Sequence, residues 1–318
     1  MLQINNENTT MKKCSLPSYV SILLFVAICL FSHSMSAKAA PADNSFLQGR
    51  SNAGNDLFEN VKYTKEDSAE VVRLLSMTPK GNDVLFYARK FLGRPYVAFT
   101  LEVADPEELV VNLRGLDCTT YVETVLALTM TYRQGGRSFS DYLRNLEYIR
   151  YRGGVRDGYL SRLHYFAWWM HDNTEKGIVE EIIGPKYWNA TMSVNDFYMT
   201  KHWKSYKMLA AHPEWVPKIT ELENEGNGRM IKYLPKRYLN LSRKELPDVH
   251  DGDVVAIVTT KEGLDFSHLG FAVWGRDGKL HLLNASMVYK KVVEDKNTFY
   301  KYMAERRTSV GISLLRLK

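Results

Sequence analysis

Cysteine is scarce in this sequence, with three residues in 318. Cys14 and Cys29 lie in an N-terminal segment that we predict is removed, which leaves Cys118 alone in the remaining chain. A single cysteine cannot form an internal disulfide bond, so the sequence excludes a small fold held together by disulfides. In an oxidising compartment a free thiol is a chemical hazard, and its presence indicates that Cys118 is either buried or a nucleophile.

The sequence also lacks the patterns typical of nucleic-acid binding and of metal binding. Its formal net charge is +6, and no run of lysine or arginine resembles a nucleic-acid-binding stripe. A metal site built from His164, His171 and His202 is conceivable, but no HExxH segment or clustered carboxylate spacing supports it. We therefore expect no nucleic-acid partner, no metal and no cofactor.

The pronounced hydrophobic run at residues 19–31 is too short to span a membrane, which takes about 20 apolar residues. It follows Lys12 and Lys13 and precedes small alanine residues, which is the pattern of a secretory signal peptide; a retained membrane anchor is the alternative. We predict a signal peptide over residues 1–39 and a flexible leader over 40–56. Export to the periplasm or cell envelope would follow, with no stable membrane span after cleavage.

The first part of the remaining chain carries three helical patterns. Residues 64–67 have the form of a capping box, which predicts that a helix begins there. Asn82 can cap a second helix, and Gly93 is placed to end it. Asp117 is a good N-cap for a third helix, in which apolar residues recur at helical spacing over 118–132.

The last part of the chain is rich in strand patterns. Residues 253–260, 267–274 and 280–286 are predicted strands, joined by turns that contain glycine. A helix over 297–306 and a strand over 310–315 complete the chain. Helices followed by an antiparallel meander predict an α+β domain.

Residues 137–245 give weaker signals, with helix-like stretches over 139–149 and 160–171. We interpret this region as a large, family-specific elaboration on a smaller catalytic core. Many of its aromatic side chains look exposed, among them Trp168, Trp169, Trp188, Trp203 and Trp215.

Cys118 is predicted to lie in the first turn of its helix. Free N–H groups and the positive end of the helix dipole lower the pKa of a thiol there, and the same N–H groups can hold an oxyanion. The alternative is a small buried residue on an apolar helix face. Two further residues favour the interpretation of Cys118 as a nucleophile: His268 begins a strand 150 residues later, and Asn284 lies on the next strand. Cys, His, Asn is the chain order of papain-type enzymes.

The hairpin between these two strands can be checked by its register. If residues 276–278 form a three-residue loop with Gly278 in the left-handed position, Asn284 becomes a same-face diagonal neighbour of His268. A loop one residue longer or shorter would put them on opposite faces. We predict that His268 is the general base and that Asn284 orients it, with Ser286 and His281 as rival orienting residues.

Several segments carry a resemblance to a known family: GRPYV (93–97), GLDCTTYVET (115–124), DGDVVAI (251–257) and SHLGFAV (267–273). In this order they resemble the NlpC/P60 superfamily of papain-like cell-wall hydrolases. Two longer stretches resemble its DUF1460 branch, VVNLRGLDCTTYVE (110–123) and YLSRLHYF (159–166). The resemblance implies one catalytic domain over 57–318, in which the cysteine helix packs against an antiparallel sheet and 137–245 is the insertion.

The resemblance also implies an activity and further site residues. It implies an N-acetylmuramoyl-L-alanine amidase, which cuts between the glycan and the stem peptide of peptidoglycan. Tyr96 corresponds to a family tyrosine that could donate to the oxyanion or contact substrate, although a packed tyrosine is the alternative. Asn284 is a departure, since many members carry histidine there. We assign five further residues to substrate binding: Asp117, Arg162, His164, Tyr165 and Ser267.

Other functions use the same residues. A γ-D-glutamyl endopeptidase acting on the stem peptide would need the same Cys, His and Asn. An inactive wall-binding module would not need the thiol, and an acyltransferase would differ only in what resolves the thioester. In each case we expect peptidoglycan fragments (muropeptides) as the partners and a monomeric protein.

Overall fold

An antiparallel sheet from the C-terminal half of the chain organises the fold. The computed structural model describes residues 59–103 and 105–318. The predicted signal peptide (1–39) and the predicted leader (40–56) both lie outside the described residues. The strand order is β4-β5-β10-β6-β7-β8-β9, and β3 pairs with β10. The strands are β3 (Val179–Glu181), β4 (Ala190–Ser193), β5 (Met230–Pro235), β6 (Val254–Thr259), β7 (Phe266–Trp274), β8 (Leu280–Ser286), β9 (Lys291–Glu294) and β10 (Ser309–Leu317).

Helices cover both faces of this sheet, and a short parallel pair, β1 (Val61–Lys62) and β2 (Leu109–Val110), lies apart from it. The helices are α2 (Lys65–Leu75), α3 (Asp83–Arg89), α4 (Cys118–Arg133), α5 (Phe139–Arg150), α6 (Phe166–Glu175), α7 (Tyr198–Lys201), α8 (Lys207–Ala211), α9 (Val216–Gly226) and α10 (Phe299–Ala304). Five 3-10 turns are η1 (Arg152–Gly154), η2 (Tyr159–Ser161), η3 (Trp203–Ser205), η4 (Pro213–Trp215) and η5 (Lys236–Tyr238). No helix among the described residues is long and apolar enough to cross a membrane.

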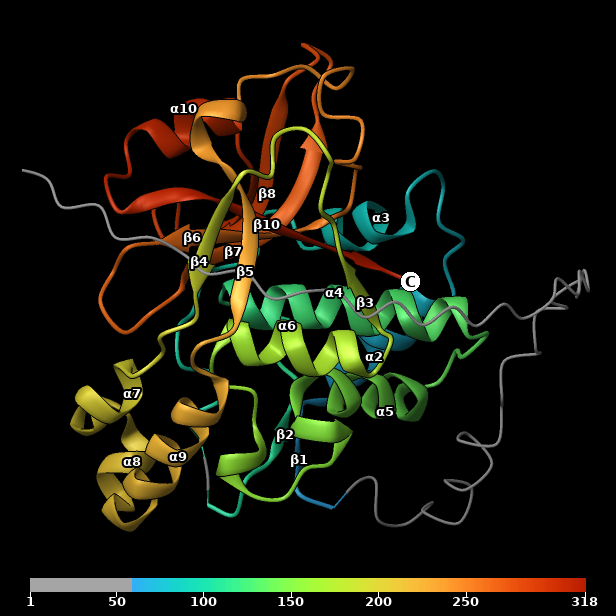
Figure 1. Ribbon diagram of the computed structural model, residues 1–318. Helices are drawn as coiled ribbons and strands as arrows, with labels where there is room; N and C mark the ends of the chain where they lie inside the picture. The colour runs from blue at the N-terminus through green and yellow to red at the C-terminus, as the bar shows by residue number, and fades with distance from the viewer. Residues whose placement is uncertain (1–58, 104) are drawn as a thin grey trace, which may run out of the picture. The chain divides into compact units, whose positions relative to one another are not determined.

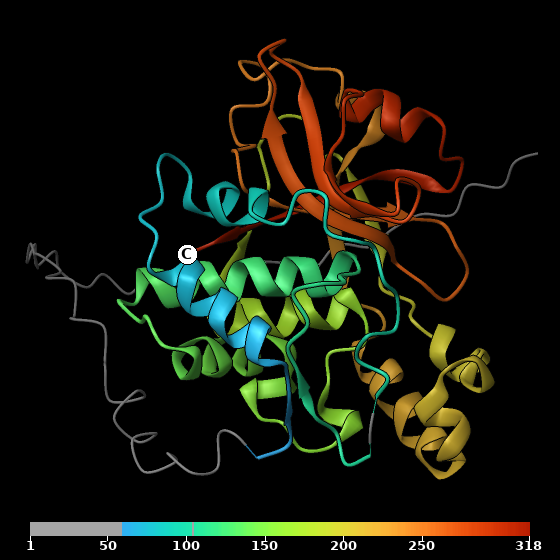
Figure 2. The same ribbon diagram turned by 180° about the vertical axis from the view of Figure 1, so that it is seen from behind.

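Alternate residues of the strands enter two apolar cores, one on each face of the sheet. In β7, Leu269 and Phe271 belong to the core that contains α4, whereas Ala272 and Trp274 belong to the core that contains α10. Figures 1 and 2 show α4 below the sheet and α10 above it. Because α4 contacts the sheet on one side and α2 and α5 on another, every residue over 120–131 is buried.

The predicted helix starts are confirmed. Thr64 caps α2, and Asp67 returns the hydrogen bond to the Thr64 backbone, which is the reciprocal capping box. Asn82 caps α3 by accepting from the N–H of Leu85 at 2.8 Å, although this helix ends at Arg89, earlier than expected. Helices and an antiparallel sheet therefore form a mixed α+β fold, as the order of the patterns predicts.

The predicted hairpin register is also confirmed. Gly278 has a left-handed φ of 71°, and the Gly275 N–H donates to the carbonyl of Lys279 at 2.8 Å. Phe271 of β7 lies opposite Leu283 of β8, which is the pairing that the three-residue loop requires. This register fixes which residues of the two strands share a face.

Residues 137–245 differ from the expectation in two ways. Trp168, Trp169 and Trp188 are only 3%, 1% and 7% exposed, so the prediction of exposed tryptophans is wrong for these three. The region supplies α5 and α6 to the core around α4 and adds β3, β4 and β5 to the sheet. Trp168 and Trp169 are buried because α6, which carries them, packs against α5 and β3.

The helix predicted over 160–171 begins only at Phe166. The preceding residues are held in another conformation because Arg162 forms an isolated antiparallel bridge with Tyr151. The Leu163 N–H also donates to the carbonyl of Arg150 at 3.0 Å. These long-range backbone bonds override the local helical pattern.

Candidate active site

Cys118 is the first residue of α4, and its side chain is partly exposed. Asp117 precedes it as the N-cap, where its Oδ1 accepts from the N–H of Thr120 at 2.8 Å. The Thr120 hydroxyl oxygen accepts in return from the Asp117 N–H at 3.0 Å. This box fixes the start of the helix, so the thiol lies at the positive end of the helix dipole.

His268 and Asn284 meet on the same face of the hairpin. The Asn284 Oδ1 lies 2.9 Å from the His268 Nε2, and Asn284 is fully buried. Gly270 makes room for this contact, because a Cβ there would lie 3.0 Å from the Cβ of Asn284 and 2.7 Å from the Leu283 carbonyl oxygen. With Nε2 engaged as the donor to an amide oxygen, Nδ1 is the ring nitrogen left to act as a base.

The two rival orienting residues have other partners. The Ser286 hydroxyl oxygen accepts from the N–H of Tyr289 at 3.2 Å. The ring nitrogens of His281 lie 3.0 Å from the carbonyl oxygen of Asp295 and 3.1 Å from a carboxylate oxygen of Asp277. Asn284 is therefore the residue whose side chain is positioned to orient His268.

Cys118 lies close to the strand that carries His268. Helix α4 packs against β7, and the backbone N–H of Leu269, the residue after His268, is near enough to the Cys118 thiol to stabilise its anion. Cys118 thus lies at the start of α4, and His268 lies near the start of β7, the strand that packs against this helix.

The protonation states of this pair differ from the expectation. Loss of hydration, followed by the nearby charge of Asp117, raises the pKa of Cys118 to about 12. Burial lowers the pKa of His268, against the opposing effect of its hydrogen bond to Asn284. The predicted low thiol pKa is therefore wrong for the unliganded protein, because the surroundings of the helix start disfavour the thiolate more than the helix dipole favours it. Both pKa shifts favour the neutral forms, a thiol at Cys118 and an uncharged imidazole at His268.

Tyr96 lies beside the nucleophile. The Val97 N–H donates to the carbonyl of Leu116 at 3.1 Å, which joins this segment to the residues just before Cys118. Burial first, and then the charges of Cys118 and Asp117, raise the pKa of Tyr96 to about 12. Its hydroxyl group therefore stays protonated and can act as a hydrogen-bond donor.

Three of the residues assigned to substrate binding have partners inside the protein, which argues against that assignment. Arg162 is 4% exposed and Tyr165 is also 4% exposed. The Tyr165 hydroxyl donates to a carboxylate oxygen of Glu223 at 2.6 Å, and the His164 Nε2 lies 2.8 Å from the carbonyl oxygen of Tyr159. Their motif is conspicuous in sequence because it builds the fold around the site.

The other two residues assigned to substrate binding are the chain neighbours of Cys118 and His268. Asp117 uses its carboxylate to cap α4, so it acts on the cysteine through helix geometry and through its charge. Ser267 is exposed and directly precedes His268. Its hydroxyl oxygen lies 3.5 Å from the carbonyl oxygen of Ile257, and as the strand neighbour of His268 its side chain points to the opposite face of β7.

Sequence reasoning missed a cation near His268. Arg306, just after α10, places its guanidinium carbon 3.5 Å from the centroid of the Tyr302 ring. Its charge contributes to the lowered pKa of His268. No sequence pattern marks this arginine, because its position depends on how α10 packs against β8.

The described residues contain no group of three or more histidine, cysteine, aspartate or glutamate side chains that could hold a metal ion. His164, His171 and His202 accordingly form no such group. The chemistry that the site offers is that of a thiol, an oriented imidazole and hydrogen-bond donors, which suits nucleophilic attack on a carbonyl carbon.

Comparisons with known proteins indicate an amidase-like hydrolase. Residues 87–312 match the model of the AmiA-like family, described as N-acetylmuramoyl-L-alanine amidase-like. The match covers well over half of the chain, and the protein belongs to this family. No match was found among the curated proteins.

Solved structures of similar proteins share the fold. An N-acetylmuramoyl-L-alanine amidase from Bacteroides uniformis is 42% identical, with a TM-score of 0.70 over 74% of this chain and 98% of that one. A Bacteroides fragilis protein with a provisional xylanase name is 37% identical, with a TM-score of 0.68 over 73% of this chain and 99% of that one. A Legionella pneumophila protein of the DUF1460 family shares the fold at 22% identity, with a TM-score of 0.61 over 80% and 95% of the chains.

Proposed function

We propose that the protein is an exported cysteine amidase that cleaves the amide bond between N-acetylmuramic acid and L-alanine in peptidoglycan. The observation that carries this proposal is the hydrogen bond of 2.9 Å between His268 and Asn284, on the strand that packs against the helix start bearing Cys118. The amidase-like family and the name of the Bacteroides uniformis structure support the choice of bond.

The proposed reaction begins with a neutral pair. When the lactyl carbonyl carbon of the substrate approaches Cys118, the thiol proton passes to the Nδ1 of His268 as the sulfur forms its bond to carbon. Backbone N–H groups at the start of α4, and the Tyr96 hydroxyl, would donate to the oxyanion. The raised thiol pKa makes this a concerted step in which the imidazole accepts the proton only as the carbon–sulfur bond forms.

Collapse of the tetrahedral intermediate breaks the carbon–nitrogen bond. His268 returns its proton to the leaving amine of L-alanine, and the muramyl lactyl group stays on Cys118 as a thioester. Water then attacks the thioester carbonyl and gives its proton to His268, which passes it to the departing sulfur. Asn284 keeps Nδ1 directed at the thiol through both halves of the reaction.

We further propose that the core is papain-like and of the NlpC/P60 type. Its support is that α4 packs against the antiparallel strands β7 and β8, with the nucleophile at the start of the helix. Peptidoglycan fragments would be the partners, and the predicted signal peptide supports export to the periplasm or cell envelope.

Two alternatives involve other bonds. A γ-D-glutamyl endopeptidase would use the same three residues. The provisional xylanase name of the Bacteroides fragilis structure suggests a glycosidase, which needs a pair of free carboxyl groups about 5–9.5 Å apart across the sugar bond. The carboxylate next to the nucleophile, Asp117, is already bonded to Thr120 in the capping box, which favours the thiol chemistry.

Digestion of a defined disaccharide dipeptide tests the proposal. An amidase releases free disaccharide and intact L-alanyl-D-isoglutamine, and weighing the products by mass spectrometry identifies the bond. Cys118→Ala should abolish the cleavage without a loss of fold, because a helix start accepts alanine. A disaccharide tripeptide contains the bond after the γ-D-glutamyl residue that the dipeptide lacks, and release of its third residue would support the endopeptidase instead. Identical products from the Cys118→Ala variant would end the cysteine mechanism.

A further inference from the structure

Phe99 is the most exposed aromatic side chain near the candidate site, and its backbone is strained. It is 68% exposed and has a φ of 61°, in the left-handed region that bulky residues avoid. Among the described residues only Asn60, Phe99 and Lys290 combine a positive φ with a side chain. Such strain persists where the surrounding structure holds it, and it is concentrated at functional sites.

The loop that carries Phe99 lies over the start of α4. Residues 95–97 pair with Leu116, two residues before the nucleophile. Thr100 and Leu101 line a small cavity together with Thr120 and Thr124 of α4. Phe99 is therefore held between two segments that both contact the surroundings of Cys118.

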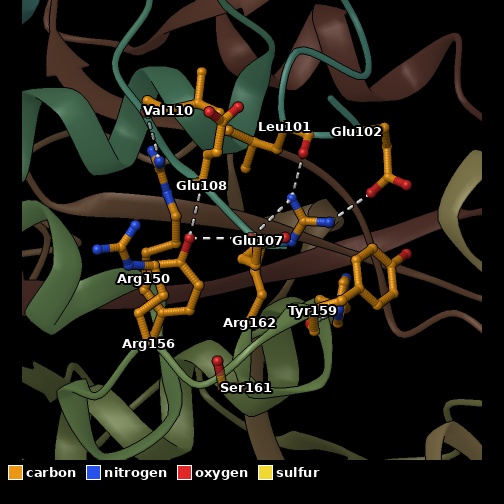
Figure 3. Close-up of polar contacts among 12 residues, drawn as sticks. Leu101, Glu102, Glu107, Glu108, Val110, Arg150, Arg156, Tyr159, Ser161 and Arg162 are labelled. Carbon is orange, nitrogen blue, oxygen red and sulfur yellow. Dashed lines mark hydrogen bonds and ion pairs between the residues drawn. The ribbon is translucent and has the colours of Figure 1, made fainter. Parts of the chain in front are cut away.

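Arg162 anchors this loop from inside the protein (Figure 3). Its Nη1 donates to the carbonyl of Leu101 at 2.9 Å and its Nη2 to a carboxylate oxygen of Glu102 at 2.6 Å. A carboxylate oxygen of Glu107 lies 3.5 Å from Nη1, and the guanidinium carbon is 4.8 Å from the centroid of the Tyr159 ring. Ion pairs this well buried fix geometry, so the loop presents Phe99 in one position.

A second exposed apolar segment borders the same place. The Tyr96 N–H donates to the carbonyl of Lys290 at 2.9 Å, which joins the loop to the turn between β8 and β9. In that turn Met287, Val288 and Tyr289 are 59%, 68% and 46% exposed. With Val97 and Phe99 they make up five of the twelve exposed large hydrophobic residues of the described chain, so apolar surface is concentrated beside the site.

The chemistry of this surface selects one part of the proposed substrate. The stem peptide of a muropeptide is dominated by carboxylates, amides and amines, which an apolar surface does not recognise. A pyranose ring instead has a face of C–H groups, which packs against the negative face of an aromatic ring.

We propose that Phe99 is a substrate-binding residue on which a sugar ring of the glycan packs, and that Arg162 is a positioning residue that holds Phe99 in place. This inference rests on the proposed function. It also revises the role of Arg162, which acts on the sugar through the loop and does not touch it.

Two substrates separate the sugar contact from the chemistry. Both contain the lactyl–L-alanine amide, but the disaccharide dipeptide carries the sugar rings and N-lactoyl-L-alanyl-D-isoglutamine lacks them. We expect Phe99→Ala to raise KM for the disaccharide dipeptide by about 10-fold or more, because an aromatic side chain loses its buried contact. Its kcat/KM for the lactoyl peptide should stay within about 2-fold of wild type. Equal effects on both substrates, or no effect on either, would overturn the inference.

Matched variants control for general effects of apolar surface. Phe99→Trp keeps an aromatic face and should keep the wild-type KM, whereas Phe99→Leu should behave like Phe99→Ala. Met230→Ala removes an exposed side chain of similar exposure (64%) on β5 and should change neither substrate. If Met230→Ala has the same effect as Phe99→Ala, the apolar contact is non-specific and the inference fails.

The positioning role of Arg162 is tested by changing its loop partner Glu102, because an Arg162 variant can fail to fold. Glu102→Ala should raise KM for the disaccharide dipeptide when Phe99 is present and have no further effect in Phe99→Ala. Glu102→Gln keeps an acceptor for Arg162 and should restore most of the loss. Additive effects of Glu102→Ala and Phe99→Ala would contradict the coupling.

A binding measurement distinguishes failure of this inference from failure of the proposed function. If the wild type cleaves neither substrate, the amidase proposal fails, and the sugar contact is then measured by calorimetry with the disaccharide GlcNAc-MurNAc and the Cys118→Ala protein. Binding that is lost in the Cys118→Ala, Phe99→Ala double variant supports the sugar contact. Absence of binding, or binding that does not depend on Phe99, overturns it.

Discussion

The Asn284 side chain offers the sharpest test of how the site is built. It is fully buried, and its Oδ1 is 2.9 Å from the His268 Nε2. Asn284→Ala removes this acceptor and leaves a half-buried imidazole N–H without its partner. The imidazole can then rotate or change tautomer, so that Nδ1 is no longer fixed toward the thiol.

The size of the effect follows from the burial of the bond. Leaving a buried donor unpaired costs about 1–3 kcal/mol. If this cost is added to the activation free energy, kcat/KM falls by about 5- to 150-fold, because about 1.4 kcal/mol corresponds to a tenfold change in rate. His268→Ala should cost far more because it removes the base itself, and Asn284→His, which supplies another ring acceptor, should recover part of the loss.

Steady-state hydrolysis of the disaccharide dipeptide measures this effect, with thermal unfolding as the check on the fold. His281→Ala is the matched control, since His281 bonds to Asp295 and Asp277 and should not affect the rate. Wild-type activity of Asn284→Ala, combined with loss of activity in His281→Ala or Ser286→Ala, would refute the assignment of the orienting residue.

Three further predictions concern charge and burial. Because the pKa of Cys118 is raised, its alkylation by iodoacetamide should be slow near pH 6 and accelerate in alkaline solution, and rapid reaction near pH 6 would show a resting thiolate instead. Glu123 and Arg150 form a buried ion pair at 2.7 Å, so Glu123→Ala leaves the Arg150 charge unpaired in the core and should lower the free energy of unfolding in denaturant by about 3–5 kcal/mol. Glu221→Ala removes an exposed ion pair with Lys218 and should lower it by less than about 1 kcal/mol. Burial and the charge of Asp265 raise the pKa of Asp196, so the folded protein keeps a proton that the unfolded chain releases. The protonated Asp196 contributes fully to stability in acid, and this contribution is lost as the pH rises through the raised pKa. Asp196→Asn should therefore reduce the fall of Tm between mildly acidic and alkaline pH. An unchanged dependence of Tm on pH would contradict this.

The parts of the site that follow local rules could be predicted from the sequence. Asp117 marks the start of α4 because a short side-chain acceptor satisfies the free N–H groups there. Gly278 fixes the hairpin loop, and the loop fixes the face that His268 and Asn284 share. These inferences need only neighbouring residues and the periods of helices and strands.

The parts that depend on distant partners could not be predicted. Arg162 looks like a ligand-binding arginine in sequence, but its carboxylate partners lie about 60 residues earlier in the chain. The thiol pKa was predicted to be low from the helix start, whereas the packing of other segments around Cys118 raises it. Arg306 reaches the surroundings of His268 only through the packing of α10.

The central claim is that Cys118 attacks the lactyl carbonyl of muramic acid. The most direct measurement is an acid quench of the enzyme during turnover of a disaccharide dipeptide, followed by mass mapping of the peptide that contains Cys118. We predict a thioester adduct with the mass of the disaccharide lactyl group on Cys118, and no adduct in Cys118→Ala. An adduct on Cys118 with a mass other than that of the disaccharide lactyl group, an adduct on another residue, or continued cleavage by the Cys118→Ala protein would contradict the claim.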